Sequence, residues 1–482
     1  MVSLFLNVQD SPFNARGDGL GDDTKAIQSA IDKAKSLSNS SATNAGAVVL
    51  LPPGEYLISE PLILPASGNN GLIAIHLMGH PRSSRLKGTI NFPPYSGLIE
   101  WEQIPQNHIP GETGAARALA QKIAGIEFNL PLVDGVKAIY RRWDRQLFPS
   151  NNTKEEVSRA AFEQQRSRLQ IHLEDIVING SNIHHESLLR FEGSVVQSTI
   201  RNVHGNCARG SDPKYSSILL HFDDGEDLVN AYPPSWYIHM FDNVGFQYGH
   251  IENVETNFYG RGGFHSLFRG RLNRSTVIGA HPGGGSRSTP AFDLYNSFES
   301  ELINLSTEVT AEKPVYRLKN CHGLTFRKIG IGTPTPVPTG QKDSNGNDLY
   351  YPDTSINARD GSDLLGNGIE LYGCTDCLFE SRTTHPSVAT FKTRVSGLKT
   401  DSSGKLLRPN MRDVDINGRP LRIYIITMDD SCQRNLFKGF HINAEIPEDE
   451  FRLDGNSSIY NYISGFNHHS RTSFKVGQWS QP

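Results

Sequence analysis

The stretch Phe13–Asp32, FNARGDGLGDDTKAIQSAID, joins a loop of glycines and aspartates to a helical pattern without a break. Apolar residues then recur at helical spacing along one face: Ala26, Ile27, Ala30, Ile31, Ala34 and Leu37. Asp22 or Asp23 is suited to cap the first turn, because negative charge stabilises a helix N-terminus. The stretch therefore predicts an amphipathic helix that begins directly after the acidic loop.

Glycines before a helix also occur in loops that bind phosphate groups. Those loops follow a strand and direct glycine N–H groups toward the anion. Here Asp18, Asp22 and Asp23 crowd the loop and would repel a phosphate, and the Gly-Lys-Ser/Thr ending of a P-loop is missing. The sequence thus disfavours a nucleotide site.

Strand patterns follow the predicted helix. The segment AVVLLPPGEYLIS (Ala47–Ser59) predicts a strand, a Pro-Gly turn and a second strand. Strand patterns dominate the remaining chain except over residues 111–169, where three segments show helical spacing. We therefore expect a helical insertion over 111–169, which serves either as a surface or subunit contact or as one wall of a binding cleft.

The second half of the chain contains an internal repeat. In each copy, two apolar residues stand two positions apart, and a small residue and a further apolar residue follow. The copies are Phe292, Leu294, Ser297 and Leu302; Tyr316, Leu318, Cys321 and Phe326; Ile369, Leu371, Cys374 and Phe379; and, in part, Cys432 and Phe437. A period in the twenties is typical of a solenoid with parallel strands and right-handed crossovers. The amphipathic helix would cover its apolar end.

The opening stretch, followed by VVLLPPGEYLIS, resembles the N-terminal signature of the pectate-lyase-like superfamily. The resemblance implies an all-β fold, a right-handed parallel β-helix that forms a single domain over 1–482. An N-terminal cap at 13–38 and the helical insertion at 111–169 would complete it. The superfamily includes lyases, glycoside hydrolases, fructotransferases and phage tailspike depolymerases, so the resemblance implies a polysaccharide or oligosaccharide substrate without specifying the reaction.

Composition restricts the partners. The 482 residues carry a net charge of −4, so a basic surface for nucleic acid is not expected. No apolar run is long enough to predict a membrane span, and the first ten residues do not resemble a secretory signal. With the resemblance, we expect an extracellular or virion-associated protein, and the superfamily makes a homotrimer a plausible assembly.

The cysteines predict a structural role. Cys374 and Cys377 form a CxxC pair, but a second ligand pair at zinc-site spacing is missing from the sequence. Cys321, Cys374 and Cys432 instead occupy equivalent positions, each five residues before a phenylalanine. We expect them to stack as a ladder of small residues, and we expect neither a metal nor another cofactor.

Two kinds of reaction break the glycosidic bonds of polysaccharides. Hydrolysis or transglycosylation uses a carboxylate pair, whereas β-elimination uses a base and a cation that neutralises a uronate. The segment HFDDGED contains adjacent Asp223 and Asp224, but no Gly-His-Gly follows at the distance that polygalacturonases use. The calcium-binding aspartates of pectate lyases are not recognisable either.

Residues 239–274 are dense in titratable groups, and stacked coils lie about 5 Å apart. We expect Glu255 to be the catalytic acid and Asp242 or Glu252 the base or nucleophile. His281 and Glu308, part of a polar column at strand ends, are the reserve catalytic candidates; a histidine base among this column would point to elimination. The substrate-binding candidates are Arg261, His265, Arg269, Arg271, Trp236 and His385.

We therefore expect a carbohydrate-active enzyme that cleaves glycosidic bonds by a carboxylate-pair mechanism. Two alternatives stay open. The arginine-rich coil favours a polysaccharide lyase that acts on a uronate, and the fold also occurs in glycan-binding spikes or adhesins without activity.

Overall fold

The computed structural model describes the following residues: 4–40, 47–65, 75–102, 119–142, 153, 169–180, 186–207, 217–223, 245–258, 265–282, 290–305, 315–329, 337–342, 348–351, 369–380, 390–391, 399–400, 406–407, 426–428, 431–438, 441–442, 462–464 and 467–468. They belong to two compact units. Unit 1 comprises Met1–Ser211, Ser217–Asn257 and Arg269–Val277, and unit 2 comprises Asp212–Ser216, Phe258–Phe268 and Ile278–Pro482. Within the described ranges, no helix combines the length and hydropathy needed to cross a membrane.

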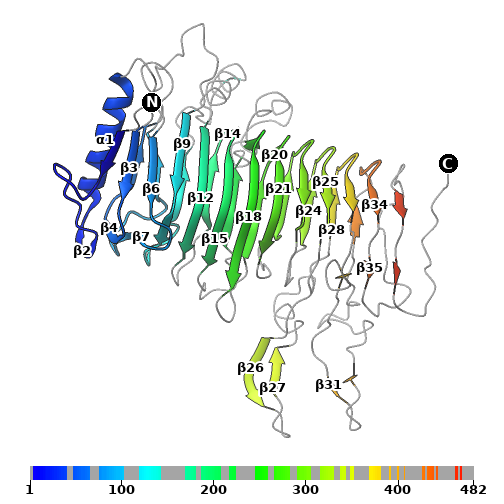
Figure 1. Cartoon of the computed structure of the whole chain (residues 1–482). Coiled ribbons are helices and arrows are strands. Elements are labelled where there is room, and N and C mark those ends of the chain that lie inside the picture. Colours follow the sequence, from blue (N-terminus) through cyan, green and yellow to red (C-terminus); the bar gives the residue numbers. More distant parts are fainter. Residues whose placement is uncertain are drawn as a thin grey trace. The chain divides into compact units, whose positions relative to one another are not determined.

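Unit 1 is a stack of parallel coils (Figure 1). Two columns of the strands of unit 1 belong to one large sheet, which we call sheet A. The first column is β1 (Leu4–Asn7), β3 (Ala47–Leu51), β6 (Ile75–Gly79), β9 (Leu119–Ala124) and the first half of β12 (Leu169–Asn179). The second is β2 (Asp18–Asp22), β4 (Gly54–Ile58), β7 (Ser84–Gly88), β10 (Ile126–Asn129) and the second half of β12. Later coils add β14 (Ser194–Val196), β15 (Thr199–Cys207), β17 (Gly245–Gln247), β18 (His250–Phe258) and β20 (Leu272–Asn273).

Sheet B of unit 1 receives one strand from each coil. In order it contains β5 (Leu62–Leu64), β8 (Gly97–Trp101), β11 (Lys137–Arg141), β13 (Ser187–Glu192) and β16 (Ser217–Asp223), all paired in parallel. Strands with this order and spacing form the right-handed parallel β-helix that the sequence predicts.

Helix α1 (Thr24–Ser40) is the helix that the opening stretch predicts. Its apolar face packs on β1, β3, β5 and β6, and Ile27, Ala30, Ile31 and Ala34 are at most 1% exposed. The Gln28 side chain accepts a hydrogen bond from the Ile63 amide at 2.8 Å and donates one to its carbonyl at 3.1 Å. The N-terminal cap therefore starts later than residue 13, because β2 precedes the helix.

The acidic loop before α1 uses its aspartates to bind its own backbone. Asp23 accepts hydrogen bonds from the amides of Arg16 and Gly17 at 2.6 and 3.0 Å. Asp18 accepts from the amides of Leu20 and Gly21 at 2.9 and 3.1 Å. The amides that would bind a phosphate are thus occupied by carboxylates, which agrees with the charge argument against a nucleotide site.

Replacing Ile27 by Asp tests how much α1 contributes to unit 1. Ile27 is fully buried, so Ile27→Asp places an unpaired carboxylate in an apolar interface and should lower the free energy of unfolding by about 3 kcal/mol or more. Ser29→Asp, at an exposed position of the same helix, is the control and should leave the melting temperature within a few degrees. A wild-type melting temperature for Ile27→Asp would show that α1 does not stabilise the stack.

The helical insertion predicted over 111–169 is wrong where the structure describes that range. Strands β9, β10 and β11 lie between Leu119 and Arg141, and β12 begins at Leu169. Every residue of β11 is buried, so its apolar residues do not alternate with polar ones. A short strand that is buried on both faces lacks the period-two signal that separates strands from helices. Most other residues of this range lie outside the described part.

Unit 2 continues with parallel strands in three columns. The first is β22 (Phe292–Tyr295), β24 (Tyr316–Lys319), β28 (Ile369–Tyr372) and β33 (Ile426–Met428). The second is β23 (Glu301–Ile303), β25 (Thr325–Arg327), β29 (Leu378–Glu380), β34 (Leu436–Lys438) and β36 (Tyr462–Ser464). The third is β30 (Thr390–Phe391), β35 (His441–Ile442) and β37 (Asn467–His468).

Two antiparallel pairs join β26 (Val337–Lys342) to β27 (Asp348–Tyr351) and β31 (Lys399–Thr400) to β32 (Leu406–Leu407). Strands β19 (His265–Gly270) and β21 (Thr276–Pro282) each have residues in both units.

The predicted repeat of unit 2 is confirmed in its register. Phe292 pairs with Tyr316 and Tyr316 with Ile369, as the aligned copies require. Leu302, Phe326, Phe379 and Phe437 likewise occupy one row. The rings of Phe326 and Phe379 stack at 4.7 Å, and those of Phe379 and Phe437 at 4.8 Å.

The cysteines of the repeat form the expected ladder. Cys321, Cys374 and Cys432 are buried free thiols, and the Cys374 amide donates to the Cys432 Sγ at 3.3 Å. Cys377 is also buried, and its amide donates to the Asn435 side chain at 3.0 Å. Hydrogen bonding to Cys321 raises the pKa of Cys374, and burial raises that of Cys377, so both thiols stay protonated.

Candidate functional site

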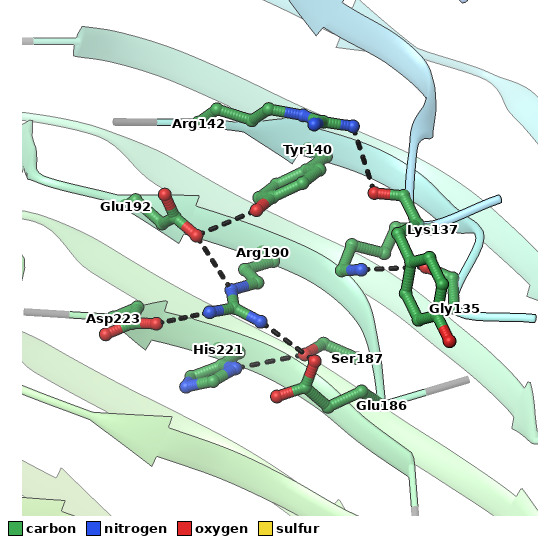
Figure 2. A network of polar contacts seen from close by, with 11 residues as sticks. Gly135, Lys137, Tyr140, Arg142, Glu186, Ser187, Arg190, Glu192, His221 and Asp223 are labelled. Atoms are coloured by element: carbon green, nitrogen blue, oxygen red, sulfur yellow. Dashed lines mark hydrogen bonds and ion pairs between the residues drawn. The ribbon is translucent and has the colours of Figure 1, made fainter. Parts of the chain in front are cut away.

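Sheet B of unit 1 carries a cluster of buried charged and polar side chains. All residues of β11 and β13 are buried, whereas β6 and β10 of sheet A alternate between buried and partly exposed residues. One face of sheet B faces the apolar core, where the rings of Phe191 and Phe222 stack at 5.5 Å. The other face carries the sheet B network (Figure 2): Lys137, Tyr140, Arg142, Glu186, Ser187, Arg190, Glu192, His221 and Asp223.

The parallel register places these residues in rows across neighbouring strands. Glu100, Tyr140, Arg190 and His221 are paired in succession on β8, β11, β13 and β16. Glu192 pairs with Asp223 in the next row that faces the same way. Paired residues lie one strand spacing apart, about 4.8 Å, so each row brings titratable groups into contact.

Arg190 is the centre of the network. Its Nη2 donates to the Asp223 Oδ2 at 2.6 Å, and its Nη1 donates to the Glu186 Oε2 at 2.9 Å. Its Nε lies 3.2 Å from the Glu192 Oε1 as an ion pair. Burial alone would lower the pKa of Arg190, but these three carboxylates outweigh it and raise that pKa. The guanidinium therefore stays charged and fixes the carboxylates around it.

Tyr140 connects the arginines to Glu192. Its hydroxyl donates to the Glu192 Oε1 at 2.8 Å. Three cations lie over its ring: the Lys137 Nζ at 4.7 Å, the Arg142 Cζ at 4.8 Å and the Arg190 Cζ at 5.7 Å from the centroid. Burial and the Glu192 carboxylate raise the pKa of Tyr140, so the phenol keeps its proton and acts as a donor.

Lys137 and His221 are the two network bases with lowered pKa values. Burial, helped by Arg190, lowers the pKa of Lys137 to about 8, and its Nζ donates to the Gly135 carbonyl at 2.7 Å. Burial is also the main cause that lowers the pKa of His221 far below its ordinary value. The His221 Nδ1 lies 3.0 Å from the Ser187 Oγ, so a neutral imidazole and a hydroxyl share one hydrogen bond.

The network pairs its carboxylates with its cations and reaches solvent at two points. Glu186, Glu192 and Asp223 surround the cations Arg190 and Lys137, while Arg142 is paired with the Glu100 Oε1 at 3.2 Å. The Glu186 side chain is 49% exposed and that of Arg142 is 40% exposed. The remaining titratable members are at most 9% exposed. A transition state with positive charge would be stabilised where it forms beside the buried carboxylates Glu192 and Asp223.

Comparisons with known proteins agree with this architecture. The family described as "Rhamnogalacturonase A/epimerase, pectate lyase-like" matches residues 5–209, a range that contains most of unit 1. Residues 5–209 are therefore similar to the pectate-lyase-like superfamily. The A-module of the mannuronan C-5 epimerase AlgE6 from Azotobacter vinelandii has a similar fold, with a TM-score of 0.50 and 11% identity over 97% of this chain and 100% of that one.

Two further similarities are more limited. The DFA-IIIase of Arthrobacter chlorophenolicus has a TM-score of 0.43 and 12% identity over 98% of this chain and 99% of that one. A probable glucan endo-1,3-beta-glucosidase of Arthroderma benhamiae is 44% identical over 62 residues. That match covers 12% of this chain and only 7% of the curated relative's length.

Of the acids chosen from the sequence, Glu252 and Glu255 lie within the described residues, and neither joins the sheet B network. Glu252 and Glu255 lie on β18 of sheet A, on either side of Asn253, which has a positive φ of 52°. Glu252 lies 3.5 Å from the Nε2 of His250, and Glu255 lies 3.6 Å from the Nδ1 of His204. Both are partly exposed, and their catalytic role stays a prediction.

The other sequence candidates are distributed as follows. Asp242, Glu308, Arg261, Trp236 and His385 lie outside the described residues. His265 is in β19, and His281 is in the part of β21 that belongs to unit 2. Arg271 is buried next to Gly245. Arg269 is the candidate with a link to the network, because its charge contributes to the lowered pKa of His221.

Sequence reasoning missed most of the network, although two signals were present. Asp223 was noticed in HFDDGED, but only as part of a polygalacturonase motif that is incomplete. Lys137 and Tyr140 were hidden because their strand was assigned to the helical insertion. A charged residue inside an otherwise apolar strand, as Arg190 in SLLRFE, is the pattern that could have identified the site.

The buried ammonium of Lys137 predicts a pH-dependent stability. Its pKa of about 8 lies below the ordinary 10.5, so the unfolded chain binds more protons between these values. The contribution of Lys137 to stability should therefore rise from pH 8 toward pH 10, while the raised pKa values of Cys374 and Cys377, and at higher pH that of Tyr140, act in the opposite direction. Lys137→Met should remove this rise and stabilise unit 1 by about 2–3 kcal/mol at pH 7.

Denaturant unfolding of both proteins at pH 7, 8, 9 and 10 measures this effect. The control is Lys87→Met, since that side chain is 46% exposed on sheet A and should not alter the pH profile. A wild-type slope that persists in Lys137→Met would show that another group titrates.

Proposed function

We propose that this protein is a carbohydrate-active enzyme that cleaves or transfers a glycosidic bond at the polar face of sheet B, with Glu192 and Asp223 as its carboxylate pair. The observation that carries the proposal is their register: they are paired on β13 and β16, buried, and bound to the same arginine. One strand spacing of about 4.8 Å is close to the roughly 5–5.5 Å between the carboxylates of retaining glycosidases.

The surroundings of the pair suggest different roles. Asp223 accepts a short charge-assisted hydrogen bond from Arg190 at 2.6 Å, which favours its ionised form. We assign it the role of nucleophile or charge stabiliser. Glu192 lies farther from the same guanidinium, at 3.2 Å, and accepts a hydrogen bond from the neutral phenol of Tyr140 at 2.8 Å. We assign Glu192 the role of general acid and base, with Tyr140 as its positioning residue.

The charge of the network favours a neutral glycan. Arg190 is already bound by three carboxylates, so it offers no free cation to a uronate, whereas Glu192 and Asp223 could stabilise the positive charge of an oxocarbenium-like transition state. The match with a relative described as a probable glucan endo-1,3-beta-glucosidase supports the same choice, although it covers only 62 residues. We therefore propose a neutral glucan as the substrate class.

Elimination from a uronate is the second candidate, and Lys137 is the observation that favours it. A buried amine with a pKa of about 8, close to a phenol, is suited to remove a proton near neutral pH. The arginines of the network would then need to bind the substrate carboxylate, although Arg190 already holds three carboxylates of its own.

A panel of soluble polysaccharides, neutral and uronate-containing, separates these candidates. New reducing ends or transfer products from a neutral glucan, without absorbance from an unsaturated sugar, are the expected result. Unsaturated products from a uronate would replace the hydrolase proposal by the lyase. Retention of a glycan without any product would identify a binding spike and overturn both enzymatic candidates.

A further inference from the structure

Three exposed apolar side chains lie on two loops of unit 1 that lead into sheet B. Ile90 and Tyr95 belong to the loop between β7 and β8 and are 75% and 64% exposed. Leu132, 58% exposed, belongs to the loop between β10 and β11 of the next coil. The two loops are in contact, because the Tyr95 amide donates to the Asp134 carbonyl at 3.0 Å.

Tyr95 is held in an unfavourable backbone conformation. Its φ of 58° lies in the left-handed region, which a bulky residue adopts only at an energetic cost. Gly135 makes room for its ring, since a Cβ atom at Gly135 would lie 2.3 Å from the Tyr95 Cδ1. The chain therefore fixes this ring at the surface, with backbone strain at Tyr95 and a glycine opposite it.

Arg142 connects Tyr95 to the sheet B network. Its Nη2 donates to the Tyr95 carbonyl at 3.0 Å and to the Glu100 Oε1 at 3.2 Å. The same guanidinium lies over the ring of Tyr140, whose hydroxyl is bound to Glu192. Glu100 on β8 is two strands away from β13, so this end of the network lies on the order of 10 Å from the Glu192 row.

We propose that Tyr95, with Ile90 and Leu132, forms a sugar-binding subsite that holds a distal unit of the glycan whose cleavage is assigned to Glu192 and Asp223. An exposed aromatic ring offers an apolar face to the C–H face of a sugar, and Arg142 and Glu100 offer polar groups for its hydroxyls. The distance between the Glu100 end of the network and the Glu192 row exceeds the length of one sugar ring. The subsite would therefore favour longer glycan chains over short ones. The inference rests on the proposed function.

A protein partner is a poorer occupant for this surface. A stable interface buries about 800 Å² per partner, far more than three side chains provide. The neighbouring Arg142 and Glu100 are already paired with each other, so this pair adds no net charge that would attract a charged protein. A sugar ring, by contrast, is small enough to be covered by one aromatic side chain and its two neighbours.

Binding and kinetics of Tyr95→Ala and Tyr95→Phe test the subsite, with a soluble β-1,3-glucan and its disaccharide as probes. In the Glu192→Gln background, calorimetry should show about tenfold weaker glucan binding for Tyr95→Ala, the loss of one stacked ring, with Tyr95→Phe unchanged. Disaccharide binding should not change in either variant. Tyr248→Ala is the matched control, because Tyr248 is 54% exposed and has a φ of 50° but lies between β17 and β18.

Equal glucan binding by Tyr95→Ala and Tyr248→Ala would reject the proposed subsite. It would not affect the proposal that Glu192 and Asp223 are the catalytic pair. Weaker glucan binding in Tyr95→Ala, combined with normal turnover in Asp223→Asn, would support the subsite and reject the catalytic pair. If Tyr95→Ala instead changed the oligomeric state with no effect on glucan binding, the surface would be a protein contact and the subsite would be rejected.

Discussion

Replacing Asp223 by Asn should lower turnover on the cleaved glucan by about a thousandfold or more, while unit 1 stays folded. The amide keeps the shape of the side chain but removes the charge that would attack or stabilise the anomeric carbon. It also loses the charge in the 2.6 Å hydrogen bond from Arg190, so the melting temperature should be measured beside kcat and KM. A variant with normal folding and near-normal turnover would reject Asp223 as the nucleophile.

The partner variant Glu192→Gln separates the two roles. An acid is dispensable when the leaving group needs no proton, so Glu192→Gln should recover much of its rate on an activated aryl glycoside. Asp223→Asn should stay slow on both substrates. Recovery in Asp223→Asn instead of Glu192→Gln would exchange the assignments.

Glu252→Gln is the matched control for these variants. Glu252 is a partly exposed carboxylate of sheet A that contacts His250, away from the sheet B network. Its replacement should leave turnover nearly unchanged. If Glu252→Gln were inactive and Asp223→Asn active, the residues predicted from the sequence would form the catalytic site after all.

The sequence predicted the register of unit 2 because equivalent positions of successive coils carry similar residue types. Each coil places an aromatic or aliphatic residue in the row of Phe326 and Phe379, and a small residue in the row of Cys374. Stacked equivalents have similar neighbours, so similar residues recur at equivalent positions. The N-terminal helix was predictable for a related reason, because Ile27 and Ile31 stand on one apolar face.

The sheet B network was harder to predict because its members are distant in the sequence and single within their strands. Tyr140, Arg190 and His221 meet only because three coils of unequal length return to the same register. The strand that carries Tyr140 is also buried on both faces, so its residues lack alternation. Local patterns therefore predicted a helix, whereas the parallel pairing with β8 and β13 determines a strand.

Arg190→Met should be the most destabilising substitution in the network. Methionine fills a similar volume but leaves the buried carboxylates of Glu192 and Asp223 without their cation. Removing one partner of a buried ion pair costs about 3–5 kcal/mol, and denaturant unfolding at pH 8 measures that loss. The control is Arg201→Met, whose 46% exposed side chain is paired with Glu174 at 3.2 Å and should cost less than about 1 kcal/mol.

The cause of this loss can be tested separately from its size. Adding Glu192→Gln and Asp223→Asn to Arg190→Met removes the two buried charges and should recover much of the stability. A triple variant as unstable as Arg190→Met alone would show that Arg190 contributes packing rather than charge. In that case the carboxylates would not depend on Arg190 for their ionised state, and the charge argument for a neutral glycan would lose its basis.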